Sequence, residues 1–235
     1  LSAVTFLTTN SFAAQPSYLY KATLVRAAPG KLLDLIDLYK AQMPVYDARG
    51  DERPFWMRHS QGDQWDLLLL FPMGSYADYY RKERLTKRTA NSPKSFQEKL
   101  QRWVAWQEDI FVFGPPLDEV KNAFDGTSFF HVEMFQALPG KHAELLQQRQ
   151  MENVYLKNID RPQNLIFVRD QGGPWDLFTV GFYRDLKHFA ASADVPEAAE
   201  EQAAKTAGFE AANRIGTYLR TLIMKHHDTL AVRIK

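Results

Sequence analysis

The sequence predicts an α+β protein made of two consecutive halves with the same order of elements. A hairpin pattern occurs twice, with Gln-Gly, Trp-Asp-Leu and a following apolar run at 61–70 and again at 171–180. Pro-Gly-Lys also occurs twice, at 29–31 and 139–141, in front of a helical pattern. Both features recur 110 positions apart, as Pro29 to Pro139 and Trp65 to Trp175. A shared register is stronger evidence for an internal repeat than periodicity alone.

The first half reads β-α-β-β-α-β over residues 17–116. Alternating apolar residues predict a strand at 17–26, and apolar residues at helical spacing predict a helix from 32 that ends at Pro44. The remaining elements are expected as follows: strands at 55–60 and 65–71, a short helix at 75–80, a charged surface connection at 81–94, a helix at 95–109 and a strand at 110–113.

A polar linker at 117–126 leads into the second half, residues 127–235, where the order restarts. Its elements are expected as follows: strands at 128–136, 165–170, 175–182 and 228–234, helices at 141–157, 184–191 and 203–225, and an insertion at 193–202. Asp228 is the counterpart of Asp109, although it lies farther along the chain than the repeat spacing of 110 positions predicts. The insertion accounts for the additional residues.

Composition excludes several classes of function. The 235 residues are 45% hydrophobic and 24% charged, which is ordinary for a globular protein. The net charge of +1 gives no excess of positive charge that would attract nucleic acid. Cysteine is absent, which excludes disulfides, thiol catalysis and cysteine metal sites. No apolar run reaches the roughly 20 residues of a membrane-spanning helix. Glycine-rich phosphate loops, a nucleophile elbow and zincin motifs are also missing.

The N-terminal segment 1–16 has features of a targeting sequence. It is uncharged and mildly apolar, and Ser11 to Gln15 resembles a small-residue cleavage site. We therefore expect a signal-peptide remnant and a periplasmic or secreted protein. The alternative is a tail without function, which leaves a cytoplasmic protein open.

The order β-α-β-β-α-β is that of the ferredoxin-like split βαβ unit, and two copies can cover each other by packing sheet against sheet. Over 17–114 and 127–235 the chain resembles the dimeric α+β barrel superfamily, with both halves fused in tandem. That superfamily includes the antibiotic-biosynthesis monooxygenases, EthD-like and NIPSNAP-like proteins, and the haem-handling chlorite dismutase branch. The resemblance implies a small-molecule pocket between the helices and the sheet of a half. No catalytic motif of any branch can be placed on this sequence.

His131 and Glu133 form the first candidate site, because residues two apart on a strand share a face. They could begin a two-His-one-carboxylate metal site or act as a general-base pair. The alternative is a structural polar pair. The equivalent first-half residues are Lys21 and Thr23.

A second candidate is His226-His227-Asp228, expected between the last helix and the last strand. We include His227 with His131 and Glu133 as catalytic candidates, and His226 as a ligand-binding one. The alternative is that both imidazoles only favour a helix C-terminus. Further ligand-binding candidates are Arg58, His59 and Arg169 near strand ends and the aromatic Tyr155. An arginine or histidine there could hold an anionic substrate or a haem propionate, or could simply reach solvent.

The leading functional hypothesis is a small-molecule enzyme, an oxygenase or related oxidoreductase acting on an aromatic or polycyclic ligand in a helix–sheet pocket of the second half. The alternatives are a non-catalytic binding protein for haem or another hydrophobic ligand, and an interaction module. The cofactor stays unknown, with haem or a single metal ion open. A small-molecule ligand is expected as partner, without nucleic acid, and the chain is expected as a monomer or homodimer.

Overall fold

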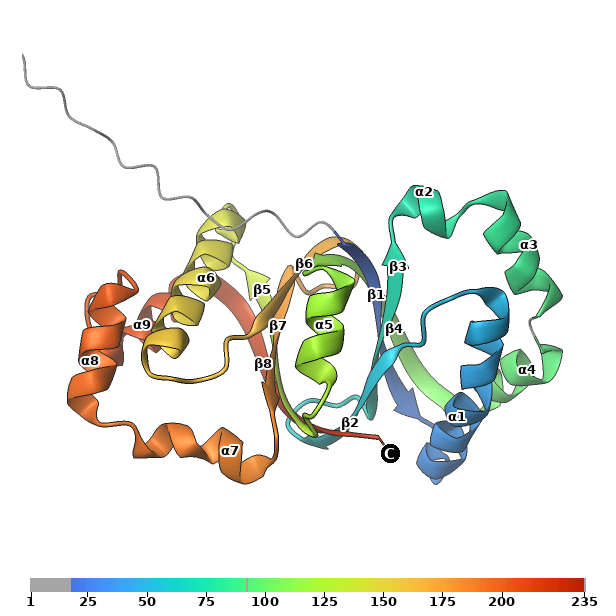
Figure 1. Ribbon diagram of the computed structural model, residues 1–235, viewed down its shortest axis with the longest axis horizontal. Coiled ribbons are helices and arrows are strands. Elements are labelled where there is room, and N and C mark those ends of the chain that lie inside the picture. The colour runs from blue at the N-terminus through green and yellow to red at the C-terminus, as the bar shows by residue number, and fades with distance from the viewer. Residues whose placement is uncertain (1–17, 92, 235) are drawn as a thin grey trace, which may run out of the picture.

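The computed structural model describes residues 18–91 and 93–234 and confirms the α+β prediction (Figure 1). Across these residues eight antiparallel strands close into one barrel, in the order β1-β3-β2-β8-β5-β7-β6-β4. Helices cover the outer face of each half, with α1, α3 and α4 on one side and α6, α8 and α9 on the other (Figure 1). The segment 1–16, expected to be a signal-peptide remnant, lies outside the described residues.

The first half contains β1 (Tyr18–Ala27), α1 (Leu32–Arg49), β2 (Phe55–Gln61), β3 (Leu67–Gly74), α2 (Tyr76–Tyr79), α3 (Lys82–Ala90), α4 (Lys94–Trp103) and β4 (Val104–Gly114). Helix α5 (Leu117–Phe124) connects the halves. The second half contains β5 (Phe129–Ala137), α6 (His142–Asn158), β6 (Leu165–Gly172), β7 (Leu177–Tyr183), α7 (Leu186–Ala190), η1 (Ala191–Asp194), α8 (Glu197–Thr206), η2 (Ala212–Arg214), α9 (Ile215–Arg220) and β8 (Ile223–Arg233).

The halves are joined because each contributes a hairpin strand to the other. Strand β2 pairs with β8, and β6 pairs with β4, so no edge strand remains in the barrel. Inward side chains of all eight strands form one apolar core, and α5 adds Val120 and Phe124 to it. The expected linker 117–126 is therefore largely a helix with a buried face.

The repeated Trp-Asp-Leu sequence has the same structural role in both halves. Asp66 accepts a hydrogen bond from the Ala27 N–H at 2.8 Å, and Asp176 accepts one from the Ala137 N–H at 2.8 Å. Each aspartate thus ties its hairpin to the end of the half's first strand. The preceding Trp65 and Trp175 are buried in the barrel core. Both tryptophans therefore anchor their hairpins in the shared core.

The repeated Gln-Gly sequence marks the points where the hairpins cross the other half. Gly62 has a φ of +118°, and a Cβ there would lie 2.1 Å from the Asp228 carbonyl oxygen. Gly172 has a φ of +77°, and a Cβ there would lie 2.5 Å from the Asp109 carbonyl oxygen. Only glycine permits both the left-handed backbone and this close approach.

Two first-half predictions were wrong in their details. The first helix continues through Pro44 to Arg49, because Tyr46 is buried beyond the proline and Gly50 supplies a left-handed cap. The charged connection at 81–94 contains helix α3, although this helix buries no residue of its own. Asp51 holds it by accepting hydrogen bonds from Arg84 at 2.7 Å and Arg88 at 2.9 Å.

The later predicted helices were too long. The helix expected at 95–109 ends at Trp103, because Val104 adopts an extended backbone and pairs with Ala27. The helix expected at 203–225 is broken at Gly208, whose φ is +92°, and is replaced by the end of α8, η2, α9 and the start of β8. Strand β8 consequently begins at Ile223 and includes all of 226–228. Within the described part of the chain, no helix is long and apolar enough to cross a membrane.

We predict that Gly62→Ala and Gly172→Ala each lower the free energy of unfolding by about 3 kcal/mol, from left-handed strain combined with overpacking. Gly30→Ala is the matched control, because Gly30 has a φ of +74° but nothing within 4 Å of a Cβ. The control isolates the strain and is expected to cost about 1 kcal/mol. Urea denaturation measures all three values. Equal losses in the three variants would show that the crossing contacts do not hold the halves together.

Candidate functional site

Each half presents a polar cluster on the outer sheet face beneath its first helix. Thr23 pairs with Asp109 across β1 and β4, and Glu133 pairs with Asp228 across β5 and β8. The equivalent sets are Lys21, Thr23, Gln107 and Asp109 in the first half and His131, Glu133, His226 and Asp228 in the second. Equivalent positions of the two halves therefore have side chains of different chemical type.

The second-half cluster joins imidazoles and carboxylates from β5 and β8. His131 Nε2 lies 2.8 Å from Asp228 Oδ1. His226 Nε2 lies 3.5 Å from Glu133 Oε1 and 3.6 Å from Asp228 Oδ2. The structure therefore brings together the sequence candidates His131, Glu133 and His226, and adds Asp228.

Helix α6 covers this cluster with a buried guanidinium. Arg149 is 3% exposed, lies 3.4 Å from Glu133 Oε2 and also pairs with Glu152. Its guanidinium lies 4.8 Å from the ring centroid of Phe135. On the first-half helix α1, the equivalent positions are Tyr39 and Gln42. Arg149 therefore fills the layer between helix and sheet in the second half.

The charges of this cluster influence one another. Burial alone would raise the pKa of Glu133, but the adjacent His226 and the charge of Arg149 outweigh burial and hold the pKa below its usual value. Burial acts to lower the pKa of His131, yet the hydrogen bond to Asp228 and the charge of Glu133 raise it overall. Burial raises the pKa of Glu152. Glu133 is thus an ionised carboxylate at neutral pH.

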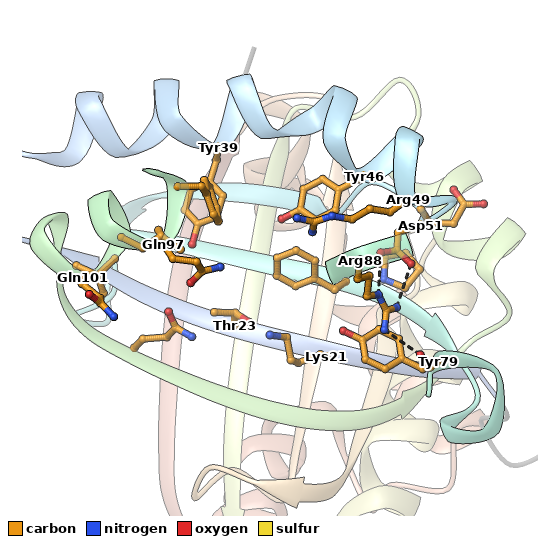
Figure 2. Close-up of a pocket in the computed structure, with 17 residues that line it drawn as sticks. Lys21, Thr23, Tyr39, Tyr46, Arg49, Asp51, Tyr79, Arg88, Gln97 and Gln101 are labelled. Carbon is orange, nitrogen blue, oxygen red and sulfur yellow. Dashed lines mark hydrogen bonds and ion pairs between the residues drawn. The ribbon is translucent and has the colours of Figure 1, made fainter. Parts of the chain in front are cut away.

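The first half contains a cavity of about 510 Å³ in the corresponding layer (Figure 2). Tyr39 and Tyr46 extend from α1 over β1 residues Lys21 and Thr23 (Figure 2). Tyr39 contacts Phe96 at a centroid distance of 5.9 Å. The other lining residues are Arg49, Asp51, Glu52, Phe71, Pro72, Tyr79, Arg88, Gln97, Leu100, Gln101, Val104 and Gln107.

One end of the cavity is closed by charged side chains around Asp51 (Figure 2). Arg88 binds Asp51 through two nitrogens, at 2.9 and 3.0 Å, and its guanidinium lies 3.5 Å from the Tyr79 ring centroid. Burial would raise the pKa of Asp51, but hydrogen bonds from Arg88 and Arg84 lower it overall. This carboxylate therefore remains charged and anchors α3 beside the cavity.

The floor of the cavity offers hydrogen-bonding groups. Lys21 Nζ lies 3.6 Å from Asp109 Oδ2 and 5.1 Å from the Phe71 ring centroid. Thr23 donates to Asp109 at 2.6 Å, so the carboxylate orients the polar groups around it. Burial raises the pKa values of Tyr39 and Tyr46, which keeps both hydroxyls protonated.

Two sequence candidates face the opposite side of the sheet. His227 Nδ1 lies 2.8 Å from Asp63 Oδ2, and its ring lies 4.7 Å from that of Trp175. His59 lies 5.8 Å from the Trp65 ring. Both imidazoles are therefore at an end of the barrel interior, apart from His131 and Glu133, because alternate strand residues point to opposite faces.

The remaining candidates lie at separate places. Arg58 is exposed on β2, and Arg169 pairs with Asp176. Tyr155 borders an open groove of about 590 Å³ between α6, α8 and η2, and burial, with Glu200 nearby, raises its pKa to about 12. The structure does not bring these three side chains to either helix–sheet cluster.

Sequence reasoning missed the first-half cavity and the contribution of Arg149. Tyr39 and Tyr46 are seven positions apart on one helix, which is the spacing of a shared face. Arg84 and Arg88 are four positions apart on a polar helix. These spacings are detectable signals, but neither specifies a cavity without the packing partners.

Haem does not fit either helix–sheet layer. Among the described residues that line the first-half cavity, none has an imidazole, thiol or thioether for the iron, and the buried tyrosine hydroxyls stay protonated. In the second half, the imidazoles lie beneath Arg149 and Glu152, where a porphyrin needs apolar faces. A single metal ion is compatible with the imidazole and carboxylate donors.

Comparison with solved structures identifies the fold. An anthrone oxidase-like protein superposes with a TM-score of 0.57 and 11% identity over 93% of this chain and 92% of its own. A Fusobacterium nucleatum protein provisionally assigned as a monooxygenase gives 0.55 and 9%, covering 93% of each chain. A mutant chlorite dismutase from Candidatus Nitrospira defluvii gives 0.51 and 10%, covering 94% of this chain and 93% of its own.

These likenesses span nearly the whole chain at low identity, so they define its fold and no more. The protein has the dimeric α+β barrel fold, with both ferredoxin-like halves in one chain, as its resemblance implied. No family model and no curated protein sequence matches it.

We predict that Arg149→Met lowers the free energy of unfolding by about 3 kcal/mol or more, because it leaves the buried Glu133 carboxylate without its main counter-charge. Adding Glu133→Gln should recover part of that loss, since the two effects are coupled. Chemical denaturation gives both values. Arg58→Met is the control, because Arg58 is exposed, and should change stability by less than about 0.5 kcal/mol. Equal effects of Arg149→Met and Arg58→Met would contradict the structural role of the guanidinium.

Proposed function

We propose that this protein is a small-molecule oxidoreductase that binds a flat, oxygen-bearing aromatic ligand in the first-half cavity. The observation that carries the proposal is the combination of aromatic walls with amide and ammonium groups in the lining of the cavity. This location differs from the second-half pocket that the sequence suggested, because Arg149 fills the equivalent space there.

The cavity has the dimensions and surface of a ligand site. Its volume of about 510 Å³ is within the range of about 300–1,000 Å³ that small-molecule pockets occupy. Phe71 and the tyrosines of α1 offer ring faces for stacking, with Tyr46 and Phe71 centroids 5.9 Å apart. Such surfaces favour a planar ligand.

The polar floor favours oxygen substituents on that ligand. Lys21 and the side-chain amides of Gln97, Gln101 and Gln107 all line the cavity and can donate hydrogen bonds. A fixed ammonium group stabilises negative charge as it develops on a phenolic or carbonyl oxygen. Lys21 is suited to this role because Asp109 holds it against the sheet.

The structural neighbours support the oxidoreductase class at a coarse level. The three neighbours described above are named as oxidase-like, monooxygenase and chlorite dismutase proteins. Their identities of 9–11% do not extend to individual residues, so the ligand class rests on the cavity of this chain. The small-molecule partner expected from the sequence is part of the same proposal.

A non-catalytic binding protein is the second candidate. It is favoured by the separation of the cavity from His131 and Glu133, because the acid–base pair suggested by the sequence lies in the other half. The cavity would then hold its ligand without converting it. Ligand binding and turnover must therefore be measured separately.

We expect a hydroxynaphthalene or hydroxyanthraquinone probe to bind with one-to-one stoichiometry in isothermal titration calorimetry. Lys21→Met should weaken binding roughly 10- to 100-fold, the effect of losing a charged hydrogen bond. Lys40→Met is the matched control, because Lys40 is exposed on α1 outside the cavity, and should bind like the unaltered protein. The unsubstituted parent hydrocarbons should not distinguish Lys21→Met from Lys40→Met.

Oxygen consumption and product mass then separate the two candidates for each probe that binds. Oxidised product that Lys21→Met diminishes supports the oxidoreductase. Binding without oxygen uptake or product would favour the binding protein. Equal affinity of Lys21→Met and Lys40→Met for all probes would overturn the cavity assignment.

A further inference from the structure

We propose that the second-half cluster binds one divalent first-row transition-metal ion through His131, Glu133, His226 and Asp228. Strands β5 and β8, which carry this cluster, lie on the other side of the barrel from β1 and α1, which border the first-half cavity (Figure 1). The inference is independent of the proposed oxidoreductase function, since it rests on a different set of side chains.

The donor atoms lie within a few tenths of an ångström of the spacing that ligands of one ion have. Metal–ligand bonds of about 2.1 Å place neighbouring donors about 3.0 to 3.4 Å apart at right-angled or tetrahedral geometry. Three observed separations are 2.8, 3.5 and 3.6 Å, between the imidazole nitrogens and the carboxylate oxygens. One donor atom each of His131, Glu133 and Asp228 lie within 4.8 Å of one another.

His226 is held in place with its Nε2 atom directed at the carboxylates of the cluster. Its Nε2 atom is buried and makes no hydrogen bond among the described residues, although two carboxylates lie near it. The ring is fixed by stacking on Phe135, at a centroid distance of 4.6 Å and an interplanar angle of 8°. The separations of Nε2 from the two carboxylates are longer than the roughly 2.7–3.2 Å of a usual hydrogen bond, and a metal ion between the three groups would bond to each of them directly.

Neighbouring side chains orient the carboxylate of Glu133. Thr179 donates to Glu133 Oε2 at 3.1 Å, and Arg149 approaches the same carboxylate. Such outer contacts fix the direction of a metal ligand. Asp228 has a side chain that is 57% exposed, which gives an ion a route from solvent.

The charge balance also favours a cation. Glu133, Glu152 and Asp228 face a single guanidinium, that of Arg149. In the first half, the carboxylate of Asp109, which is equivalent to Asp228, has a positive charge beside it, because the Lys21 ammonium lies 3.6 Å away. His131 replaces that lysine in the second half. The second half therefore has an imidazole, which can bind a metal ion through nitrogen, at the position where the first half has an ammonium group.

The donor set defines the class of metal. Two imidazoles with carboxylates suit Zn²⁺, Fe²⁺, Mn²⁺ or Co²⁺, whereas Mg²⁺ and Ca²⁺ prefer all-oxygen ligands. The solvent side of Asp228 leaves room for water as an additional ligand. The site is therefore of the open kind.

The test is titration of the chelator-treated full chain with Co²⁺, followed by visible absorption and calorimetry, with Zn²⁺ as competitor. We expect one equivalent to bind, with absorption bands of nitrogen- and oxygen-ligated Co²⁺ that Zn²⁺ abolishes. His226→Gln and Asp228→Asn should each weaken binding at least 100-fold. His226→Gln introduces the amide that the first half carries at Gln107, so it is compatible with the fold.

Two matched controls separate the site from general metal affinity. His227→Gln removes the adjacent imidazole, which faces the barrel interior, and Asp109→Asn removes the equivalent first-half carboxylate. Both should bind Co²⁺ like the unaltered chain, and circular dichroism verifies that every variant is folded. Binding of less than one equivalent, or equal affinities for His226→Gln and His227→Gln, would overturn the proposal. No aromatic ligand is present in this titration, so its result is separate from the oxidoreductase test.

Discussion

The closure of the barrel depends on two close backbone crossings. Gly62 passes the Asp228 carbonyl and Gly172 passes the Asp109 carbonyl, at positions where a Cβ has no room. These crossings let β2 join the second half and β6 join the first, so every strand finds two neighbours. The interior becomes one shared apolar core, while each half keeps a separate outer face under its own helices. Two independent sites can therefore exist on one continuous sheet.

The two outer faces differ by substitution on a common backbone. Arg149 lies over Phe135 and neutralises part of a buried acidic group, which fills the second-half layer. The equivalent Tyr39 leans toward Trp56 and Phe96, at centroid distances of 6.3 and 5.9 Å, and leaves a cavity above the sheet. The residue at this helix position therefore determines both the free space and the charge of the layer beneath it. A buried guanidinium requires carboxylates nearby, whereas a tyrosine does not. The result is a cavity in one half and a charged cluster in the other.

The sequence predicted the fold well because the repeated residues act locally. Gln-Gly, Trp-Asp and Pro-Gly-Lys each determine a turn or a tie between neighbouring elements. The boundaries were harder where apolar residues fit both periodicities, as around Trp103 and Trp106, which lie on opposite sides of a helix-to-strand change. Helix α3 depends on Asp51, a partner more than thirty positions away in the sequence, and has no apolar face to reveal it. Such contacts are tertiary, so local patterns do not encode them.

In the candidate site, too, local patterns were predictable from the sequence and tertiary contacts were not. His131 and Glu133 were recognised because strand alternation alone places them on one face. His226 and His227 were expected between the last helix and the last strand. Because β8 begins at Ile223, both belong to the strand, and the same alternation directs His226 to the cluster and His227 to the barrel interior. A shift of a few residues in one strand boundary therefore decides which imidazole meets Glu133. Chemistry-bearing residues can be identified from sequence, but their grouping depends on strand register, which here is set by the pairing of β5 with β8.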